Sequence, residues 1–278
     1  MKVGIVGLGL IGGSLAKAYS ESEIAEVYGC DRDGLTEDFA LMAKAIKGKL
    51  TKDNIPECDL ILIAVYPGAV VEYVKENAEY FGKNTLVIDC AGTKTHVCGE
   101  IFPIAEKYGF TFLGGHPMAG TQFSGFKYSR SDMFKGAPMI IVPPVFDDIA
   151  LLQWAKELLA PAGFGHISVT TAEEHDRLIA FTSQLAHVVS NAYVKSPSAQ
   201  SHKGFSAGSY KDMTRVAWLD PNMWTELFLE NKKYLLDELD IIINSLKEYR
   251  EAIAGDEKDR LRGLLLDGKL KKEAADGK

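Results

Sequence analysis

The sequence predicts an α/β protein in which a doubly wound, mostly parallel sheet is followed by an all-helical C-terminal domain. Short apolar runs alternate with helix-length amphipathic segments through residue 170, as in parallel sheets covered by helices on both faces. After Thr171 the strand pattern stops, and nearly all of the remaining chain has helical spacing. The length of 278 residues also fits two domains. We therefore place the domain boundary between residues 169 and 170.

The predicted strands are short and are spaced along the first domain. The run from Leu60 to Val65 is apolar throughout, which is expected of a central strand that is buried on both faces. In chain order, the predicted strands are 3–6, 26–30, 59–65, 85–89, 111–114, 139–142 and 166–169.

The helical part contains one Ser- and Gly-rich interruption, at 196–209. Asp220 followed by Pro221 predicts the start of a long helix, because Asp caps helices and Pro suits the first helical position. This helix is predicted to lie either in the core of its domain or in a subunit interface. Its apolar positions recur at helical spacing at Trp224, Leu227, Phe228, Leu235, Leu239, Ile242 and Leu246.

Composition and charge exclude several classes of function. Hydrophobic residues make up 46% of the chain and charged residues 25%, as in globular proteins. The N-terminus enters a strand at once, without a signal-peptide pattern, and no segment approaches eighteen apolar residues, so we expect a cytoplasmic protein that does not enter membranes. The net charge of −7 disfavours binding to nucleic acid.

The cysteines give no sign of a metal site. They lie far apart, with no neighbouring ligands at metal-binding spacing, so we expect no bound metal and reduced, mostly buried thiols. The four are Cys30, Cys58, Cys90 and Cys98.

A glycine-rich motif with a physical role for each glycine follows the first predicted strand. It has the spacing of the Rossmann dinucleotide fingerprint, with a helix after it and an acidic residue at the end of the second strand. We predict that the first glycine makes the tight turn, the second lets the backbone approach the pyrophosphate, and the third lets helix and strand pack closely. The residues predicted to bind the cofactor are Gly7, Gly9, Leu10, Ile11, Gly12, Asp31 and Arg32.

The acidic residue of this fingerprint bears on the choice of cofactor. Asp31 can accept hydrogen bonds from both ribose hydroxyls, and its charge would repel a 2′-phosphate, so NAD is favoured. Arg32 leaves NADP open, because a guanidinium beside that position can pair with the extra phosphate.

Polar residues at the carboxyl ends of strands are candidates for catalysis, because ligands bind there in doubly wound sheets. His116 stands between glycines after a predicted strand, and an imidazole with a pKa of about 6.5 can accept a hydroxyl proton. In the helical part, His187 is either a buried structural histidine or a substrate contact. Arg215 either pairs with Asp212 or Asp220 or binds a substrate carboxylate.

Three motifs in a shared order make the chain resemble the prephenate and arogenate dehydrogenases of tyrosine biosynthesis, over nearly its whole length. The first motif is the segment from Gly7 to Ser14, which contains the glycine-rich dinucleotide fingerprint. The other two are Gly115-His116-Pro117-Met118-Ala119-Gly120 and Lys211-Asp212-Met213-Thr214-Arg215-Val216-Ala217 with Asp220-Pro221-Asn222-Met223-Trp224.

The resemblance implies an NAD-dependent oxidative decarboxylation of a small substrate, and it assigns roles to individual residues. His116 corresponds to the general base that draws off the 4-hydroxyl proton, His187 to a second active-site histidine, and Arg215 to the arginine that binds a substrate carboxylate. Thr93 stands where the family usually has a serine near the hydroxyl and the nicotinamide. Lys211, like Lys94, is either a source of positive potential for the substrate or a solvated lysine.

One position of the resemblance bears on substrate choice. Gln122 replaces an acid of several relatives, and a neutral amide cannot pair with the ammonium of arogenate, so we expect prephenate to be the substrate. Relatives pair through the helical domain, which implies a homodimer.

Three alternatives remain open. Arogenate dehydrogenase is the first. A β-hydroxy acid dehydrogenase would leave His116 unexplained, and a non-catalytic NAD-binding protein would not need His116, His187 and Arg215 together.

Overall fold

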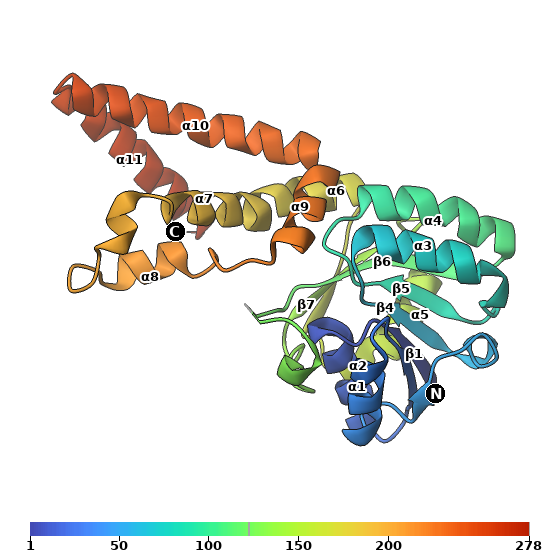
Figure 1. The fold of residues 1–278 in the computed structure, drawn as a ribbon. Helices are drawn as coiled ribbons and strands as arrows, with labels where there is room; N and C mark the ends of the chain where they lie inside the picture. The colour runs from blue at the N-terminus through green and yellow to red at the C-terminus, as the bar shows by residue number, and fades with distance from the viewer. Residues whose placement is uncertain (122, 278) are drawn as a thin grey trace. The chain divides into compact units, whose positions relative to one another are not determined.

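The computed structural model describes residues 1–121 and 123–277 (Figure 1). The chain forms two compact units, Met1–Asn231 and a second one that begins at Lys232. The first unit holds the sheet and the helices that follow it, and the second is a pair of helices. Gln122, which the sequence proposed as a specificity residue, lies outside the described residues.

Within the described residues, eight strands form one sheet in the order β3-β2-β1-β4-β5-β6-β7-β8. All neighbouring strands are parallel except β6 and β7, so the predicted doubly wound, mostly parallel sheet is confirmed. The bounds are β1 Lys2–Val6, β2 Glu26–Cys30, β3 Gly48–Lys49, β4 Leu60–Ile63, β5 Leu86–Asp89, β6 Thr111–Pro117, β7 Pro138–Val142 and β8 His166–Val169.

Helices cover both faces of this sheet. Side chains of α1 (Leu10–Glu21) and α5 (Ile149–Leu159) belong to one apolar core, and those of α3 (Pro67–Asn77) and α4 (Thr95–Tyr108) belong to a second one. Along β4, the side chains alternate between the two cores and all are buried. The apolar run that begins at Leu60 is therefore a central strand, as its composition predicts. A further helix, α2, spans Gly34–Met42.

Strand β6 is longer than the sequence indicates and takes part in two kinds of pairing. Its first residues pair in parallel with β5, and 114–117 pair antiparallel with β7. The expectation that the strand ends at Gly114 is therefore wrong, and His116 lies within the strand, opposite Ile140. The reason is tertiary, because the partner of the extension is more than twenty residues further along the chain.

The helical part of the first unit begins with a nearly continuous helix. Thr171 caps α6 (Ala172–Ile179) by accepting a hydrogen bond from the backbone N–H of Glu174. A π-helical turn, Ala180–Leu185, then leads into α7 (Ala186–Tyr193). The shorter helices α8 (Gly208–Thr214) and α9 (Pro221–Glu230) follow.

The long helix expected from Pro221 onward starts as predicted but is interrupted. Asp220 accepts hydrogen bonds from the N–H groups of Asn222 and Met223 at the start of α9. The helix ends at Glu230, and α10 (Lys232–Ala254) begins after Asn231. The buried Asn231 side chain donates hydrogen bonds to Asp176 O and to Gln184 Oε1, both at 2.8 Å. These tertiary hydrogen bonds stabilise the break between the two helices. The prediction of a single long helix was therefore wrong.

The second unit consists of α10 and α11 (Lys258–Ala275). The Tyr249 hydroxyl donates to Leu264 O, and Arg260 pairs with Glu251 and Glu257 around the connection. Many large apolar side chains of both helices are exposed, among them Ile241, Ile243, Leu246, Ile253, Leu265, Leu266 and Leu270. Across the described chain, none of the helices is long and apolar enough to cross a membrane.

Candidate active site

The turn after β1 has the local geometry that the glycine-rich motif predicts. Gly7 adopts φ +82°, where other residues are strained, and a Cβ atom on Gly12 would come within 1.8 Å of Gly7 O. By contrast, a Cβ atom on Gly9 would meet no atom within 4 Å. The turn is therefore tight, the helix packs closely against it, and the space over Gly9 is open.

The start of α1 suits an anion. Gly9 is the N-cap and provides no side-chain cap, so the first N–H groups of the helix, beginning at Leu10 and Ile11, have no partner within the helix. Such groups, together with the positive end of the helix dipole, form a binding site for phosphate. These residues fit the pyrophosphate of a dinucleotide.

Asp31 lies directly after β2, beside this turn. Its Oδ2 accepts a hydrogen bond from the Leu8 N–H at 2.7 Å, and its Oδ1 accepts one from the Asp33 N–H at 3.0 Å. The carboxylate is thus held against the glycine-rich turn. Arg32 is exposed, and it forms no ion pair with any residue that the structure describes.

A buried ion pair fixes the carboxyl end of β5. Asp89 and Lys94 are both fully buried and bonded to each other. Asp89 also accepts hydrogen bonds from the N–H groups of Ala91 at 2.8 Å and Gly115 at 3.0 Å. Lys94 is therefore not a solvated lysine, which was one of the two alternatives proposed for it. The pair joins β5 to the residue that precedes His116.

His116 belongs to a chain of three hydrogen-bonded side chains. Its Nδ1 lies 2.9 Å from Nε2 of His175, and Nδ1 of His175 lies 2.7 Å from Oδ1 of Asp176. The Asp176 carboxylate also accepts the backbone N–H groups of Lys94 and Thr95, each at 2.8 Å, and so caps α4. The chain therefore connects β6, α6 and the start of α4.

Burial, more than the surrounding charges, favours the neutral form of both histidines. Burial, with His175 and Lys94 nearby, lowers the pKa of His116 well below its ordinary value of 6.5. Burial also lowers the pKa of His175, although its hydrogen bond to Asp176 acts in the opposite sense. Burial opposes ionisation of Asp176, but the hydrogen bonds from His175 and Thr95 prevail and lower its pKa. Asp176 is thus an anion, and His116 is a neutral base.

Thr93 is buried beside this chain, and its hydroxyl already has a partner. Its Oγ1 donates to Oε2 of Glu230 at 2.5 Å. Burial raises the pKa of Glu230. The structure therefore places Thr93 against α9, with its hydroxyl on Glu230.

A second group of candidate residues lies on α7 and the helices that follow. His187 Nδ1 donates to Ser183 O at 2.9 Å, and the ring stacks on Trp224 with centroids 3.9 Å apart. Burial lowers the pKa of His187, and the charge of Arg215 lowers it further. Arg215 is exposed, and among the described residues it pairs with no carboxylate, neither Asp212 nor Asp220.

Comparison with known proteins decides the family. The family model for the nucleotide-binding domain of prephenate dehydrogenase matches residues 15–168, and the model for the prephenate dehydrogenase dimerization domain matches residues 171–266. This chain belongs to the prephenate dehydrogenase family. The resemblance that the three sequence motifs indicate is confirmed.

Curated relatives and solved structures agree with this family. The chain is 30% identical to a cyclohexadienyl dehydrogenase of Zymomonas mobilis, covering 93% of this chain and 90% of that protein. It is 29% identical to a prephenate dehydrogenase of Lactococcus lactis, covering 98% and 77%. The prephenate dehydrogenase of A. aeolicus, solved with hydroxyphenyl propionate and NAD⁺, is 26% identical with a TM-score of 0.82, covering 99% of this chain and 98% of that one. The chain is therefore an oxidoreductase that uses a nicotinamide cofactor.

The structure brings some predicted site residues of this prephenate dehydrogenase family member together and leaves others apart. His187 and Arg215 lie in one group, whereas His116 contacts His175 in another. Lys211 is exposed and, like Arg215, pairs with no carboxylate in the described part of the chain.

Sequence reasoning missed His175, Asp176 and Glu230. The first two are adjacent in the sequence, at the start of the first helix after the predicted sheet, and a His-Asp pair there is the signal that could have been noticed. Nothing local indicates that His116 is their partner. Among the described residues, no cluster of histidine, cysteine and acidic side chains could hold a metal.

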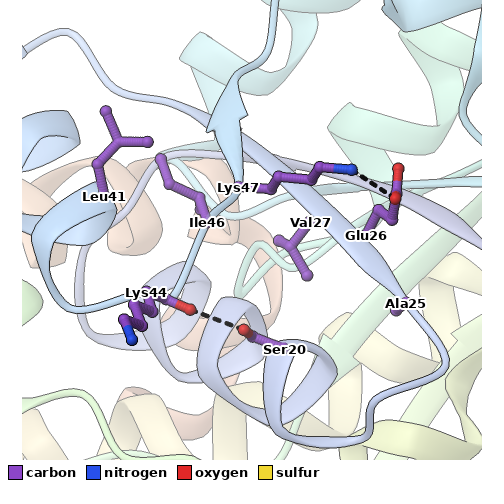
Figure 2. Close-up of a pocket in the computed structure, with 8 residues that line it drawn as sticks. All are labelled: Ser20, Ala25, Glu26, Val27, Leu41, Lys44, Ile46 and Lys47. Carbon is purple, nitrogen blue, oxygen red and sulfur yellow. Dashed lines mark hydrogen bonds and ion pairs between the residues drawn. The ribbon is translucent and has the colours of Figure 1, made fainter.

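A surface hollow of about 400 Å³ lies elsewhere on the Rossmann half (Figure 2). It borders the first residues of β2, at the amino end of the strand, whereas ligands of doubly wound sheets bind at the carboxyl ends. Within it, the Ser20 hydroxyl donates to Lys44 O, and Lys47 pairs with Glu26. The hollow is therefore separate from the candidate active site.

Proposed function

We propose that this protein is an NAD-dependent prephenate dehydrogenase of tyrosine biosynthesis, which converts prephenate to 4-hydroxyphenylpyruvate and carbon dioxide. The observation that carries the proposal is the neutral His116, whose Nδ1 is held by His175. Within the described residues, no side chain or backbone group is hydrogen-bonded to its Nε2. A base in this state is what oxidation of a hydroxyl group requires. Family membership favours this reaction over a β-hydroxy acid dehydrogenase and a non-catalytic protein.

When bound at the glycine-rich turn, NAD would supply the acceptor for the hydride that leaves the ring carbon carrying the 4-hydroxyl. His116 accepts the hydroxyl proton on Nε2 as the hydride leaves, which is a general-base role typically worth about 10²–10⁴-fold in rate. Carbon dioxide departs, its bonding electrons enter the ring, and His116 returns the proton to the ring oxygen. The product ring is aromatic, so the step is effectively irreversible.

The other predicted residues hold the substrate and the cofactor. Arg215, which pairs with no carboxylate among the described residues, is proposed to bind a substrate carboxylate, with Lys211 adding positive potential. His187 is proposed to contact the same end of the substrate. Thr93 is proposed to line the site near the nicotinamide, oriented by Glu230. In this assignment, residues 1–169 bind the dinucleotide, and the part from residue 170 onward binds substrate.

We propose NAD in preference to NADP. Asp31 is held beside the glycine-rich turn by two backbone N–H groups, where its negative charge would repel a 2′-phosphate. Exposed Arg32 is the residue that could favour NADP. We therefore expect Asp31→Ser to lower kcat/KM with NAD and raise it with NADP, and a preference that stays unchanged would contradict the assignment.

Prephenate is proposed as the better substrate because Gln122 offers no negative charge for the ammonium of arogenate. We also propose a homodimer that forms through the helical part of the chain. The match to the dimerization-domain model and the exposed apolar side chains of α10 and α11 support it.

The test of the proposed function is direct. Purified protein is mixed with NAD, and the absorbance of the reduced cofactor is followed after addition of prephenate and, separately, of arogenate. We expect turnover with prephenate that falls about 10²-fold or more in His116→Asn. The matched control is His166→Asn, at an exposed position of β8. Absence of turnover with both substrates would contradict the proposal.

A further inference from the structure

The hydrogen bonds around His116 determine which of its nitrogens carries the proton. The starting point is Asp176, whose lowered pKa makes it an anion and therefore only an acceptor. It faces Nδ1 of His175 at 2.7 Å, so this nitrogen must be the one that donates. Because burial keeps His175 neutral, its Nε2 then carries a lone pair.

The same reasoning passes from His175 to His116. A lone pair on Nε2 of His175 can only accept a hydrogen bond, and Nδ1 of His116 lies 2.9 Å away. Nδ1 of His116 is therefore protonated, and Nε2 of the neutral ring holds the lone pair. The ring planes are inclined at 61° with centroids 5.1 Å apart, so the two rings are not stacked, and the contact between them is the one between the two nitrogens.

We infer that His175 and Asp176 are positioning residues for His116, which fix the tautomer whose Nε2 can act as a base and stabilise the charge that forms there. When the substrate O–H bond breaks, an N–H bond forms on Nε2, and the electron pair of the O–H bond becomes the second bond of the C=O group as the C–H pair leaves as hydride, for which a bound nicotinamide would be the acceptor. The imidazolium of His116 then donates through His175 toward an anion, as in a catalytic triad with one additional histidine. The identity of the hydroxyl substrate rests on the proposed function; the tautomer does not.

A purely structural role is the competing explanation, because Asp176 also caps α4 through the N–H groups of Lys94 and Thr95. The two roles can be separated by changing His175 and leaving Asp176 in place. His175→Phe keeps a ring in the buried space but removes both hydrogen bonds. His175→Gln keeps their polarity, because the amide oxygen can accept from His116 while the amide N–H donates to Asp176.

The first measurement reads the tautomer without substrate. Protein labelled with ¹⁵N in histidine is studied by ¹H–¹⁵N correlation spectra that distinguish the two ring nitrogens, and His116→Asn identifies the signals of His116. We expect an Nδ1-protonated ring in the wild type and in His175→Gln, and loss of this preference in His175→Phe. The control is His166→Phe, at an exposed position.

The second measurement is steady-state kinetics with prephenate and NAD. We expect kcat of His175→Phe to fall about 10²-fold, at the lower end of the range for general-base catalysis, with the KM for prephenate nearly unchanged. His175→Gln should recover most of the loss. A structural defect would instead change KM and thermal stability in parallel with kcat, and glutamine would not rescue it.

Several outcomes would overturn the inference. An Nε2-protonated His116 in the wild type does so, and so does a His175→Phe enzyme with wild-type kcat. If His175→Phe does not fold, the wild-type tautomer and the activity of His175→Gln still decide the matter. If the wild type oxidises neither prephenate nor arogenate, the proposed function fails, and the tautomer alone then decides the positioning role.

Discussion

The basicity of His116 depends on its neighbours more than on the imidazole itself. Burial and the nearby His175 and Lys94 hold its pKa well below 6.5. A general base must be neutral, so a lowered pKa extends the active range toward acid. We predict that kcat/KM for prephenate stays level as the pH falls through 6.5 and declines only when the lowered pKa is reached. A pH–rate profile measured at constant ionic strength tests this, and an acid limb at pH 6.5 or above would contradict it.

The ion pair of Asp89 and Lys94 is fully buried, so its partners depend on each other. Removing one leaves an uncompensated charge in the interior, which costs about 3–5 kcal/mol. We predict this loss of unfolding free energy for Lys94→Met, measured by urea denaturation, and a partial recovery in Asp89→Asn/Lys94→Met. Lys75→Met removes an exposed pair with Glu100 and should cost less than about 1 kcal/mol. Equal losses in the two single variants would refute the prediction.

At the scale of single residues, the sequence predicts those residues that are marked by a pattern among their immediate neighbours. His116 stands between glycines after an apolar run, and the glycine-rich turn has its own spacing, so both could be found without a structure. His175 acquires its role only because α6 brings it to β6, from 59 positions along the chain. A tertiary contact of this kind leaves no periodic or compositional pattern.

Among the elements, β6 matters most for the site, because its extension holds His116 in the sheet. Gly115 lies against β5, and a Cβ atom there would come within 2.3 Å of Asp89 O. We predict that Gly115→Ala lowers unfolding free energy by about 1–3 kcal/mol and also lowers kcat, because β6 must move. Gly99→Ala is the control, since a Cβ atom at that position in α4 meets nothing within 4 Å. It should be neutral or stabilising by up to about 1 kcal/mol, and similar effects of the two changes would contradict the argument.

The presence of a helix or strand could be predicted better than the residues at which it begins and ends. The strands with long apolar runs were found, but β3 has only two residues and no pattern to detect. The end of β6 and the break at Asn231 depend on partners that are remote in sequence, β7 for the strand and Asp176 and Gln184 for the helix. The two wrong ends therefore have the same physical origin, a hydrogen bond made by tertiary contact.

At the scale of the whole molecule, three histidines with lowered pKa values make stability depend on pH. The folded-state pKa values of His116, His175 and His187 are all lowered, mainly by burial. Below pH 6.5 the unfolded chain therefore binds more protons than the folded one, so stability is full above about pH 6.5 and is lost as the pH falls. We predict a Tm that decreases between pH 7 and pH 5, with a shallower slope in His175→Gln, as measured by differential scanning calorimetry. A Tm that is constant over this range would contradict the prediction.

The homodimer is also a property of the whole molecule, and the second unit offers the test. Leu246 on α10 and Leu266 on α11 are both more than half exposed in the single chain. Burying such a side chain contributes about 1.5–3 kcal/mol, whereas burying a charge in its place is unfavourable. We predict that Leu246→Glu/Leu266→Glu shifts the protein from dimer to monomer at micromolar concentration, as measured by light scattering coupled to size-exclusion chromatography. Lys156→Glu, on an exposed position of α5, places the same side chain away from these helices in sequence and should leave the dimer intact. A wild-type protein that is already monomeric would refute the dimer, and a charged variant that stays dimeric would exclude these two side chains from its interface.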